Sequence, residues 1–379
     1  MTNTPLKPGS TIGILGGGQL GWMLGREAER LGFKLVVLDS SEDCASARIT
    51  DQLLVGQFAD KQLMAKFDAA VDVITLETEH VNFEFLDALP NCDKVWPSAS
   101  VFKIVQDRRR QREFLDQNGF PHTQWQSISS LEDCANASYT TGTKAILKSR
   151  SGGYDGKGQV RVDRFDSLAD AWNALGGIPA VLEAFVPFAM EVSVILTRGR
   201  DGECAEFPVA ENVHLNHVLH LTVAPARISQ ETQQRALDLC AEIAQAMDYV
   251  GTMAVELFVL NDGSLLVNEI APRVHNSGHF TLGACETSQF EQHIRAVAGL
   301  PLGSSKAMTP SVMLNLLGDL WERGEPDWSL VHKIPGASLY LYGKFPARPG
   351  RKMGHILLRS DHVDAAVDQA DKLFEALSS

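Results

Sequence analysis

The sequence contains no pair of cysteines in a CxxC arrangement. Its six cysteines are scattered, which excludes a zinc site built from thiolates and suits a reducing cytosol. Positive charge is also in short supply: the net charge of −13 argues against a general nucleic-acid or membrane-surface binder. No stretch approaches the roughly 20 apolar residues of a membrane span. Because no charged segment followed by a long apolar core opens the chain, we expect no signal peptide and a cytoplasmic location.

The most informative segment is a candidate hairpin at residues 251–270, which read GTMAVELFVLNDGSLLVNEI. Apolar residues alternate on both sides of Asp262-Gly263, a strong turn signal. If those two residues form the loop, Glu256 lies directly opposite Glu269, where like charges are destabilising. A cation between the carboxylates would remove the conflict, and Mg²⁺ shared with nucleotide phosphates suits such ligands. A longer loop would instead shift the register and leave two solvated glutamates.

The N-terminal third begins with a βαβ pattern over residues 11–39. A strand leads into the glycine turn Gly16-x-Gly18-x-x-Gly21, then a helix, then a strand that ends in Asp39. Such a turn at a helix N-terminus favours anions, and Asp39 lies where a dinucleotide site has its ribose-binding acid. An NAD-dependent dehydrogenase is therefore one interpretation. The other is that the glycines only allow tight packing of strand and helix.

Two further predicted strands, 52–55 and 72–76, continue this unit. The second is followed by Glu77 and Glu79, at the carboxyl end of a strand, where open α/β sheets bind ligands. A solvated loop is the alternative. The following helix carries the run Arg108–Arg110, which is either a solvated face or the source of one arginine in a site.

A second, smaller α/β unit has a glycine-rich loop between two predicted strands within residues 144–162. Exposed amide groups in such a loop can bind phosphate oxygens, and Lys148 and Lys157 add positive charge. The segment is not a Walker A motif, and a mobile hairpin loop is the alternative. Glu183 lies on the next apolar strand, and Glu191 opens the strand after it.

Near the C-terminus, residues 328–360 contain no acidic residue but six basic ones. In an acidic chain this local excess indicates a phosphate pocket, because arginine offers phosphate a fork of donors and lysine a point charge.

A second, separate pattern is the pair His275 and His279. Their spacing binds zinc when both lie on one helix, but Pro272 and Gly278 argue against a helix there, so the sequence does not favour a zinc site.

Taken together, the glycine loop SGGYDGKGQ (151–159), the segment NEIAPRVHNSGHFT (268–281) and the segment YGKFPARPGRKMGH (342–355) resemble the ATP-grasp superfamily. Within it they are similar to the family of 5-(carboxyamino)imidazole ribonucleotide synthases, over about residues 10–360. The resemblance implies an α/β, ATP-grasp fold with four parts. These are a Rossmann-like N-terminal domain (1–105), a small lid subdomain with the flap (106–190), a large subdomain with the metal-binding hairpin (191–300) and a small C-terminal domain (301–379).

The resemblance also implies an activity: ATP-dependent carboxylation of 5-aminoimidazole ribonucleotide by bicarbonate, through carboxyphosphate, in purine biosynthesis. The expected partners are these small molecules and Mg²⁺, with no nucleic acid or membrane, and the expected assembly is a homodimer. The alternatives are another ATP-grasp ligase, of the glycinamide ribonucleotide transformylase or biotin carboxylase type, and the dehydrogenase.

Finally, the resemblance implies residue roles. The nucleotide-binding set is Arg108, Lys148, Gly153, Tyr154, Asp155, Gly156, Lys157, Gly158, Gln159, Glu183, Ala184, Phe185, Val186, Glu191, His214, Asn268 and Glu269. Glu256 and Glu269 would hold Mg²⁺. The set for the ribonucleotide or bicarbonate is Gln19, Leu20, Glu77, Tyr154, Asp155, Arg273, His275, Lys344, Arg351 and Lys352, with catalytic roles for Asp155, Arg273 and Lys344.

Overall fold

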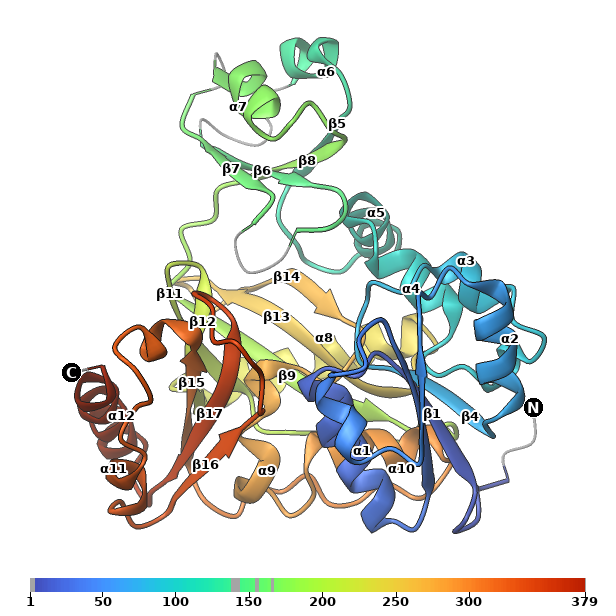
Figure 1. Cartoon of the computed structure of the whole chain (residues 1–379). Helices are drawn as coiled ribbons and strands as arrows, with labels where there is room; N and C mark the ends of the chain where they lie inside the picture. Colours follow the sequence, from blue (N-terminus) through green and yellow to red (C-terminus); the bar gives the residue numbers. More distant parts are fainter. Residues whose placement is uncertain (1–3, 138–143, 154–156, 165–166, 379) are drawn as a thin grey trace.

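The computed structural model describes residues 4–137, 144–153, 157–164 and 167–378. Within them the chain forms three sheets, which Figure 1 shows as an N-terminal unit, a small unit that stands apart, and a large central sheet. The α/β class expected from the sequence is confirmed. No helix in this part of the chain is long and apolar enough to span a bilayer.

The N-terminal unit has a parallel sheet in the order β3-β2-β1-β4. Its first strand, turn and helix lie where the sequence predicts them, because a buried apolar strand runs into a glycine turn and then an amphipathic helix. The elements are β1 (Thr11–Leu15), α1 (Gln19–Arg30), β2 (Lys34–Asp39), β3 (Gln52–Val55), α2 (Lys61–Ala69), β4 (Val73–Leu76), α3 (Phe83–Asp87) and α4 (Ala99–Val105).

The small unit follows helix α5 (Arg108–Asn118), which ends at Gly119 in the left-handed conformation with φ of 70°. Its antiparallel sheet has the order β5-β8-β6-β7, and its own core lies beneath α6 and α7. In Figure 1 this unit lies above the rest of the molecule. The elements are β5 (Trp125–Ile128), α6 (Leu131–Asn136), β6 (Ala145–Ser149), β7 (Gln159–Val162), α7 (Leu168–Ala174) and β8 (Ala180–Ala184).

The central sheet runs β14-β13-β9-β11-β12-β15-β17-β16, with β10 added beside β9. Strands from residues 301–379 continue the sheet of residues 191–300, so the division that we expected near residue 300 does not separate two sheets. The elements are β9 (Met190–Arg198), β10 (Cys204–Glu206), β11 (Ala210–Leu215), β12 (Val218–Ala224), α8 (Gln230–Ala246), β13 (Gly251–Val259), β14 (Leu265–Ala271), α9 (Thr281–Ala284), α10 (Gln289–Val297), β15 (Ser311–Leu317), α11 (Ser329–His332), β16 (Ala337–Leu341), β17 (Lys352–Arg359) and α12 (Val363–Leu377).

The hairpin of β13 and β14 places Glu256 opposite Glu269, as the sequence predicts. The route to that pairing is different, however, because residues 260–264 form a longer loop than the expected two residues. Beside the loop, Leu257 pairs with Val267, so the register is shifted by one. A β-bulge with Asn268 as its extra residue then restores the alignment of the two glutamates. The predicted pair is confirmed, and the predicted loop is wrong.

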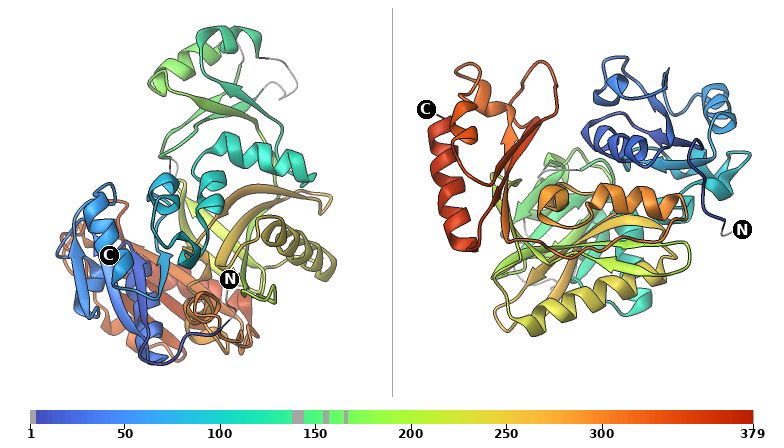
Figure 2. Two further views of the ribbon diagram at one scale, coloured as in Figure 1. Left: turned by 90° about the vertical axis from the view of Figure 1, so that its right-hand side faces the viewer. Right: turned by 90° about the horizontal axis from the view of Figure 1, so that it is seen from below.

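Helix α10 joins the N-terminal unit to the central sheet. It packs between α1 and the strands β9 and β13, while α8 covers the opposite face of the sheet (Figure 2). The fully buried His293 on α10 makes the polar link. Its Nδ1 accepts from the Thr252 amide at 3.0 Å, so its Nε2 carries the proton and donates to the Thr75 hydroxyl at 2.6 Å. The two units therefore share one core.

We predict that His293→Ala lowers the free energy of unfolding by about 2–4 kcal/mol, because it leaves a cavity and two buried unpaired groups. Burial lowers the pKa of His293 to about 3. The unfolded chain therefore binds a proton below about pH 6.5 that the folded chain refuses, and stability falls as the pH falls from 6.5 toward 3.

Urea unfolding at several pH values measures both effects. In His293→Ala the free energy of unfolding should fall less steeply as the pH is lowered. The difference in slope should correspond to at most one proton bound on unfolding. The matched control is His332→Ala, which removes an exposed histidine and should change neither quantity. Equal effects of the two substitutions would contradict the assignment.

Candidate active site

A cavity of about 1040 Å³ lies between the small unit, the central sheet and the end of the N-terminal sheet. It brings together residues predicted from segments far apart in the sequence. Those in its wall are Gln19, Leu20, Glu77, Arg108, Lys148, Gly153, Lys157, Gly158, Gln159, Glu191, His214, Glu256, Asn268, Glu269, Arg273, His275 and Lys352. Tyr154, Asp155 and Gly156 lie outside the described residues.

The carboxylate pair forms the floor of the cavity. Burial, and next the charge of Glu269, raise the pKa of Glu256 to about 7. The pair is therefore poorly neutralised by the protein alone, which is what a cation site requires. Two carboxylates are few ligands, and Mg²⁺ completes such a shell with water and nucleotide phosphates. The residues present therefore fit a magnesium ion bound together with a nucleotide.

Cations surround the pair on the side of the small unit. Arg108 Nη1 lies 3.2 Å from Glu269 Oε2, and this carboxylate is the main reason why the pKa of Arg108 is raised. The same guanidinium donates to the Gly153 carbonyl, at the start of the glycine loop, at 3.4 Å. Lys148 lies on β6 and contacts Glu183 at 2.7 Å. These positive groups converge on the space above the carboxylates.

Glu183 does not face the cavity directly, because it is almost fully buried. Burial alone would raise its pKa, but Arg112 and Lys148 outweigh that effect and lower the pKa to about 2. Sequence reasoning missed Arg112, whose fully buried guanidinium lies 2.7 Å from Glu183. In the sequence only the run Arg108–Arg110 was considered, and the one sequence signal of Arg112 is its charge on the face of α5 that also carries Leu115.

The end of β8 and the residues just beyond it, 184–186, were also predicted to contact the nucleotide. The amide groups of Ala184 and Phe185 already donate to the carbonyls of Gln124 and Lys144, and neither residue is among those that line the cavity, nor is Val186. Phe188, which sequence reasoning also missed, does line the cavity and stacks on Phe258 with ring centroids 4.6 Å apart. An aromatic wall of this kind suits a planar base.

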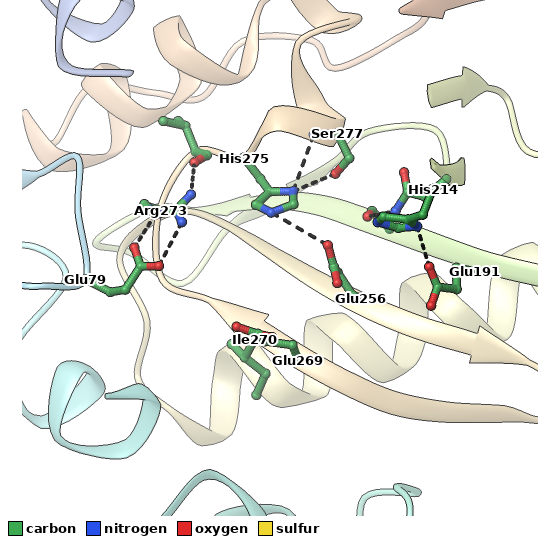
Figure 3. A network of polar contacts seen from close by, with 12 residues as sticks. Glu79, Glu191, His214, Glu256, Glu269, Ile270, Arg273, His275 and Ser277 are labelled. Carbon is green, nitrogen blue, oxygen red and sulfur yellow. Dashed lines mark hydrogen bonds and ion pairs between the residues drawn. The ribbon is translucent and has the colours of Figure 1, made fainter. Parts of the chain in front are cut away.

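Further along the same wall, Glu191 accepts from His214 at 2.5 Å between Oε2 and Nδ1. The two residues come from neighbouring strands, β9 and β11, and Figure 3 shows them beside the carboxylate pair. This pair of polar side chains suits the hydroxyl groups of a sugar.

Arg273, just beyond the end of β14, is held by Glu79 of the N-terminal unit. Its Nη2 donates to Glu79 at 2.9 Å and its Nε contacts the other oxygen, which makes a bidentate pair (Figure 3). Burial alone would raise the pKa of Glu79, but Arg273 outweighs it and lowers the pKa to about 2. Glu79 thus fixes Arg273 across the boundary of two units, a role that its position after β4 did not reveal.

His275 lies between Arg273 and the carboxylate pair. Burial, and next the charges of Arg273 and Lys352, lower its pKa to about 3. The ring is therefore neutral near pH 7, and its 3.6 Å contact with Glu256 is not an ion pair. Nδ1 is 2.8 Å from the Ser277 hydroxyl, which fixes the ring with Nε2 toward Glu256 (Figure 3).

The glycine turn before α1 is filled by the protein's own carboxylates. Glu77 accepts from the amides of Gly18 and Gly21 at 3.0 and 3.2 Å, and Asp39 accepts from Gly17 at 2.7 Å. A Cβ on Gly18 would lie 2.8 Å from Glu77, so the glycines make room for this carboxylate. The amides that would bind a pyrophosphate already have an anion. The geometry therefore opposes the dinucleotide interpretation.

A cluster of basic residues closes the far end of the cavity. Lys344 donates to Gln19 at 2.5 Å. Burial, and next the charge of Arg351, lower the pKa of Lys344 to about 8, with a smaller contribution from Lys352. Lys344 and Arg351 lie behind the wall, and Arg351 Nη1 donates to the carbonyls of Phe345 and Pro346 at 3.0 and 2.8 Å. This end of the cavity suits an anion.

Three family models match the chain in order. They are the ribonucleotide synthetase preATP-grasp domain over residues 9–106, the ATP-grasp domain over 113–290 and the phosphoribosylaminoimidazole carboxylase C-terminal domain over 311–369. Together they cover the N-terminal sheet, the small unit, the hairpin with Glu256 and Glu269, and the basic residues Lys344, Arg351 and Lys352.

Similar proteins extend over nearly the whole chain. The N5-carboxyaminoimidazole ribonucleotide synthase of Brucella melitensis is 44% identical over 364 residues, 94% of this chain and 98% of that protein. The synthase of Bacillus subtilis is 38% identical and covers 97% and 96%.

Solved structures agree with these sequences. An ADP complex of an N5-carboxyaminoimidazole ribonucleotide synthetase superimposes with a TM-score of 0.93 at 38% identity, covering 98% of this chain and 97% of that one. The Aspergillus clavatus enzyme, in complex with ADP and 5-aminoimidazole ribonucleotide, has a TM-score of 0.89 at 32% identity and covers 98% and 99%. The chain therefore belongs to the N5-carboxyaminoimidazole ribonucleotide synthase family of ATP-grasp enzymes.

Proposed function

We propose that this protein carboxylates 5-aminoimidazole ribonucleotide with bicarbonate at the expense of ATP, giving N5-carboxyaminoimidazole ribonucleotide, ADP and phosphate. The observation that carries the proposal is one cavity with a carboxylate pair, cations and an aromatic wall at one end and Lys352 at the other, with Lys344 and Arg351 behind the wall at that end. ATP would bind at the first end and the ribonucleotide at the second, so that their reacting groups come together near Arg273. We further propose Mg²⁺ as the cofactor, and a cytoplasmic homodimer as the working form.

ATP would bind at the end near the small unit. Phe188 would contact the adenine in place of the predicted residues 184–186, which do not line the cavity, and Glu191 with His214 would contact the ribose. Arg108 and Lys148 would contact the phosphates, and the loop 153–159 would close over them and exclude water. Glu256 and Glu269 would hold Mg²⁺, which neutralises phosphate charge when bound, and Asn268 would lie beside them in the cavity wall.

The reaction itself needs positioning and charge more than covalent help. A bicarbonate oxygen attacks the γ-phosphorus, the bond from that phosphorus to ADP breaks, and carboxyphosphate results. The exocyclic amine of the ribonucleotide then attacks the carboxyl carbon, phosphate leaves, and the amine loses a proton. Arg273, fixed by Glu79, would hold the carboxyl group, and the neutral His275 would lie beside it. Asp155 would contact the exocyclic amine of the ribonucleotide.

The ribonucleotide would occupy the basic end of the cavity. Arg351 and Lys352 would bind its 5′-phosphate, with Lys344 nearer the ring or the carboxyl donor. Gln19, Leu20 and Glu77 would form the opposite wall. Because Gln19 accepts from Lys344, the N-terminal unit and the C-terminal strands would enclose the substrate from two sides.

A different ATP-grasp reaction, on glycinamide ribonucleotide or biotin, is the main alternative. It would use the same nucleotide site, and only the basic end of the cavity would differ. ATP hydrolysis measured with each acceptor separates them. We expect stimulation by aminoimidazole ribonucleotide with bicarbonate, and none by glycinamide ribonucleotide or biotin. Stimulation by either of the latter would contradict the proposal.

Removing one charge of the carboxylate pair should abolish turnover without unfolding the protein. We predict that Glu269→Gln lowers ATP turnover at least about 100-fold, because charge stabilisation at the transferring phosphoryl group is lost. Steady-state assays at limiting Mg²⁺ measure this. Glu286→Gln, an exposed glutamate just beyond α9, is the control and should retain full turnover. Near-normal turnover of Glu269→Gln would refute the metal role.

Arg351 should serve one substrate only. We predict that Arg351→Ala raises the KM for aminoimidazole ribonucleotide at least about tenfold and leaves the KM for ATP unchanged, since remote binding energy is removed from one substrate. Initial-rate kinetics with each substrate varied give both values. Arg348→Ala, which removes an exposed arginine of the same loop, should change neither. A similar rise for both substrates, or for neither, is the contrary result.

Binding of the ribonucleotide should weaken above about pH 8. The pKa of Lys344 is lowered to about 8, so this lysine is charged below that pH and neutral above it. We predict that the KM for aminoimidazole ribonucleotide is lowest near pH 7, begins to rise as the pH approaches 8 and increases further toward pH 9.5. In Lys344→Arg the charge persists, so the rise should disappear. An identical pH profile in the two proteins would rule out this assignment.

A further inference from the structure

We propose that Arg112 is a positioning residue for the metal pair, because its guanidinium holds the β-bulge that turns Glu269 toward Glu256. The inference rests on the proposed function only in assigning a cation to the pair. The bulge and its contacts are features of the fold itself.

Without the bulge the sequence would not place the two glutamates together. The pairing of Leu257 with Val267 beside the loop would continue, and Asn268 would then lie opposite Glu256. Since side chains alternate along a strand, Glu269 would point to the other face. That face is the core beneath α8, where Ile270 now packs. A carboxylate there would be costly, and the cavity would hold a single glutamate.

The bulge lies on β14, the edge strand of the central sheet, so backbone groups on its outer side need partners from outside the sheet. Arg112 supplies them: Nη1 donates to the Val267 carbonyl at 3.2 Å, and Nη2 to the Asn268 carbonyl at 2.8 Å. Gln111 adds a third contact by accepting from the Ile270 amide at 3.3 Å. The backbone on both sides of the bulge is therefore fixed by two adjacent residues of one helix.

These contacts are part of a wider face of α5. Arg108, Gln111 and Arg112 are three and four residues apart, so they lie on one side of the helix. Arg108 contacts the Glu269 carboxylate itself, while the other two hold its backbone. Helix α5 thus contacts both the backbone of the bulge and the carboxylate of Glu269, while the Pro121 carbonyl, just beyond the helix, accepts from the Val267 amide at 2.8 Å.

The Arg112 fork is held in place by Glu183. Nε donates to Glu183 Oε1 at 2.8 Å, and both groups are almost fully buried. A guanidinium can reach Glu183 and two carbonyls at once because its donors form a rigid planar fork. A lysine would keep the charge next to Glu183 but could not span the bulge. Arg112 therefore couples the strand β8 of the small unit to the metal pair.

Two measurements on Arg112→Met and Arg112→Lys test this coupling. The first is amide hydrogen exchange without ligand. We expect exchange over residues 265–271 to rise at least about tenfold in both variants, while residues 251–254 of the partner strand stay unchanged. The second is Mn²⁺ binding at saturating ADP, followed by the signal of unbound Mn²⁺ in electron paramagnetic resonance. We expect the Kd for Mn²⁺ to rise about 10–100-fold, as for lost supports of metal ligands.

Arg198→Met is the matched control. Arg198, the last residue of β9, also donates to a backbone carbonyl, that of Tyr249 at 2.8 Å, in the segment that leads into β13 at the end away from the metal pair. We expect it to leave the Mn²⁺ affinity unchanged. If it weakens Mn²⁺ binding as much as Arg112→Met does, general destabilisation explains the loss and the proposal is overturned. If Arg112→Met does not fold, Arg112→Lys and Gln111→Met carry the test, the latter with a smaller effect.

The proposal would be overturned if a folded Arg112→Met protein had the same amide exchange rates over residues 265–271 and the same Kd for Mn²⁺ as the wild-type protein. Full recovery by Arg112→Lys would also overturn it, because charge alone would then suffice. If the wild-type protein itself bound no Mn²⁺ with ADP, the metal assignment in the proposed function would fail instead. The exchange measurement would still decide whether Arg112 holds the bulge.

Discussion

The active site depends on one repulsion: two carboxylates face each other across neighbouring strands in a partly buried place. Left alone, the pair favours protonation of Glu256, whose pKa is raised to about 7. The features around it act against that outcome. Arg108 lies beside Glu269, the cavity opens toward Lys148, and the hairpin is fixed from behind by α5. A site organised in this way gains most when a divalent cation and phosphate oxygens enter together, which is the requirement of phosphoryl transfer.

Much of this arrangement could be predicted because local patterns determine it. The strand and turn before α1, the alternation along β13 and β14, and the pairing of Glu256 with Glu269 all follow from residues close together in the sequence. The bulge could not be predicted in the same way. Its cause is a guanidinium about 155 residues earlier in the chain, and no alternation of apolar residues reports such a contact. Two errors, a loop that is longer than expected and an unforeseen bulge, cancel in the register.

The same limit explains why Glu79 and Glu77 were ambiguous. Both follow β4, and both read equally well as solvated loop residues. In the structure one anchors Arg273 and the other fills the glycine turn, so their roles come from partners brought by the tertiary fold. The glycine turn is a second case in which a tertiary contact decides the role of a local sequence pattern. A pattern that favours an external phosphate is satisfied internally, because the carboxylates of Glu77 and Asp39 accept from the amides of the turn.

The shared core around α10 has a consequence for synthesis of the chain. The apolar face of α1, with Leu20, Met23 and Leu24, packs on Phe290 and Ile294, which the ribosome adds more than two hundred residues later. At translation rates of roughly 5–20 residues per second, that face waits some tens of seconds for its partner. The N-terminal unit therefore emerges with all four of its strands but with one face of α1 uncovered. During that interval the nascent chain exposes the kind of surface that chaperones recognise.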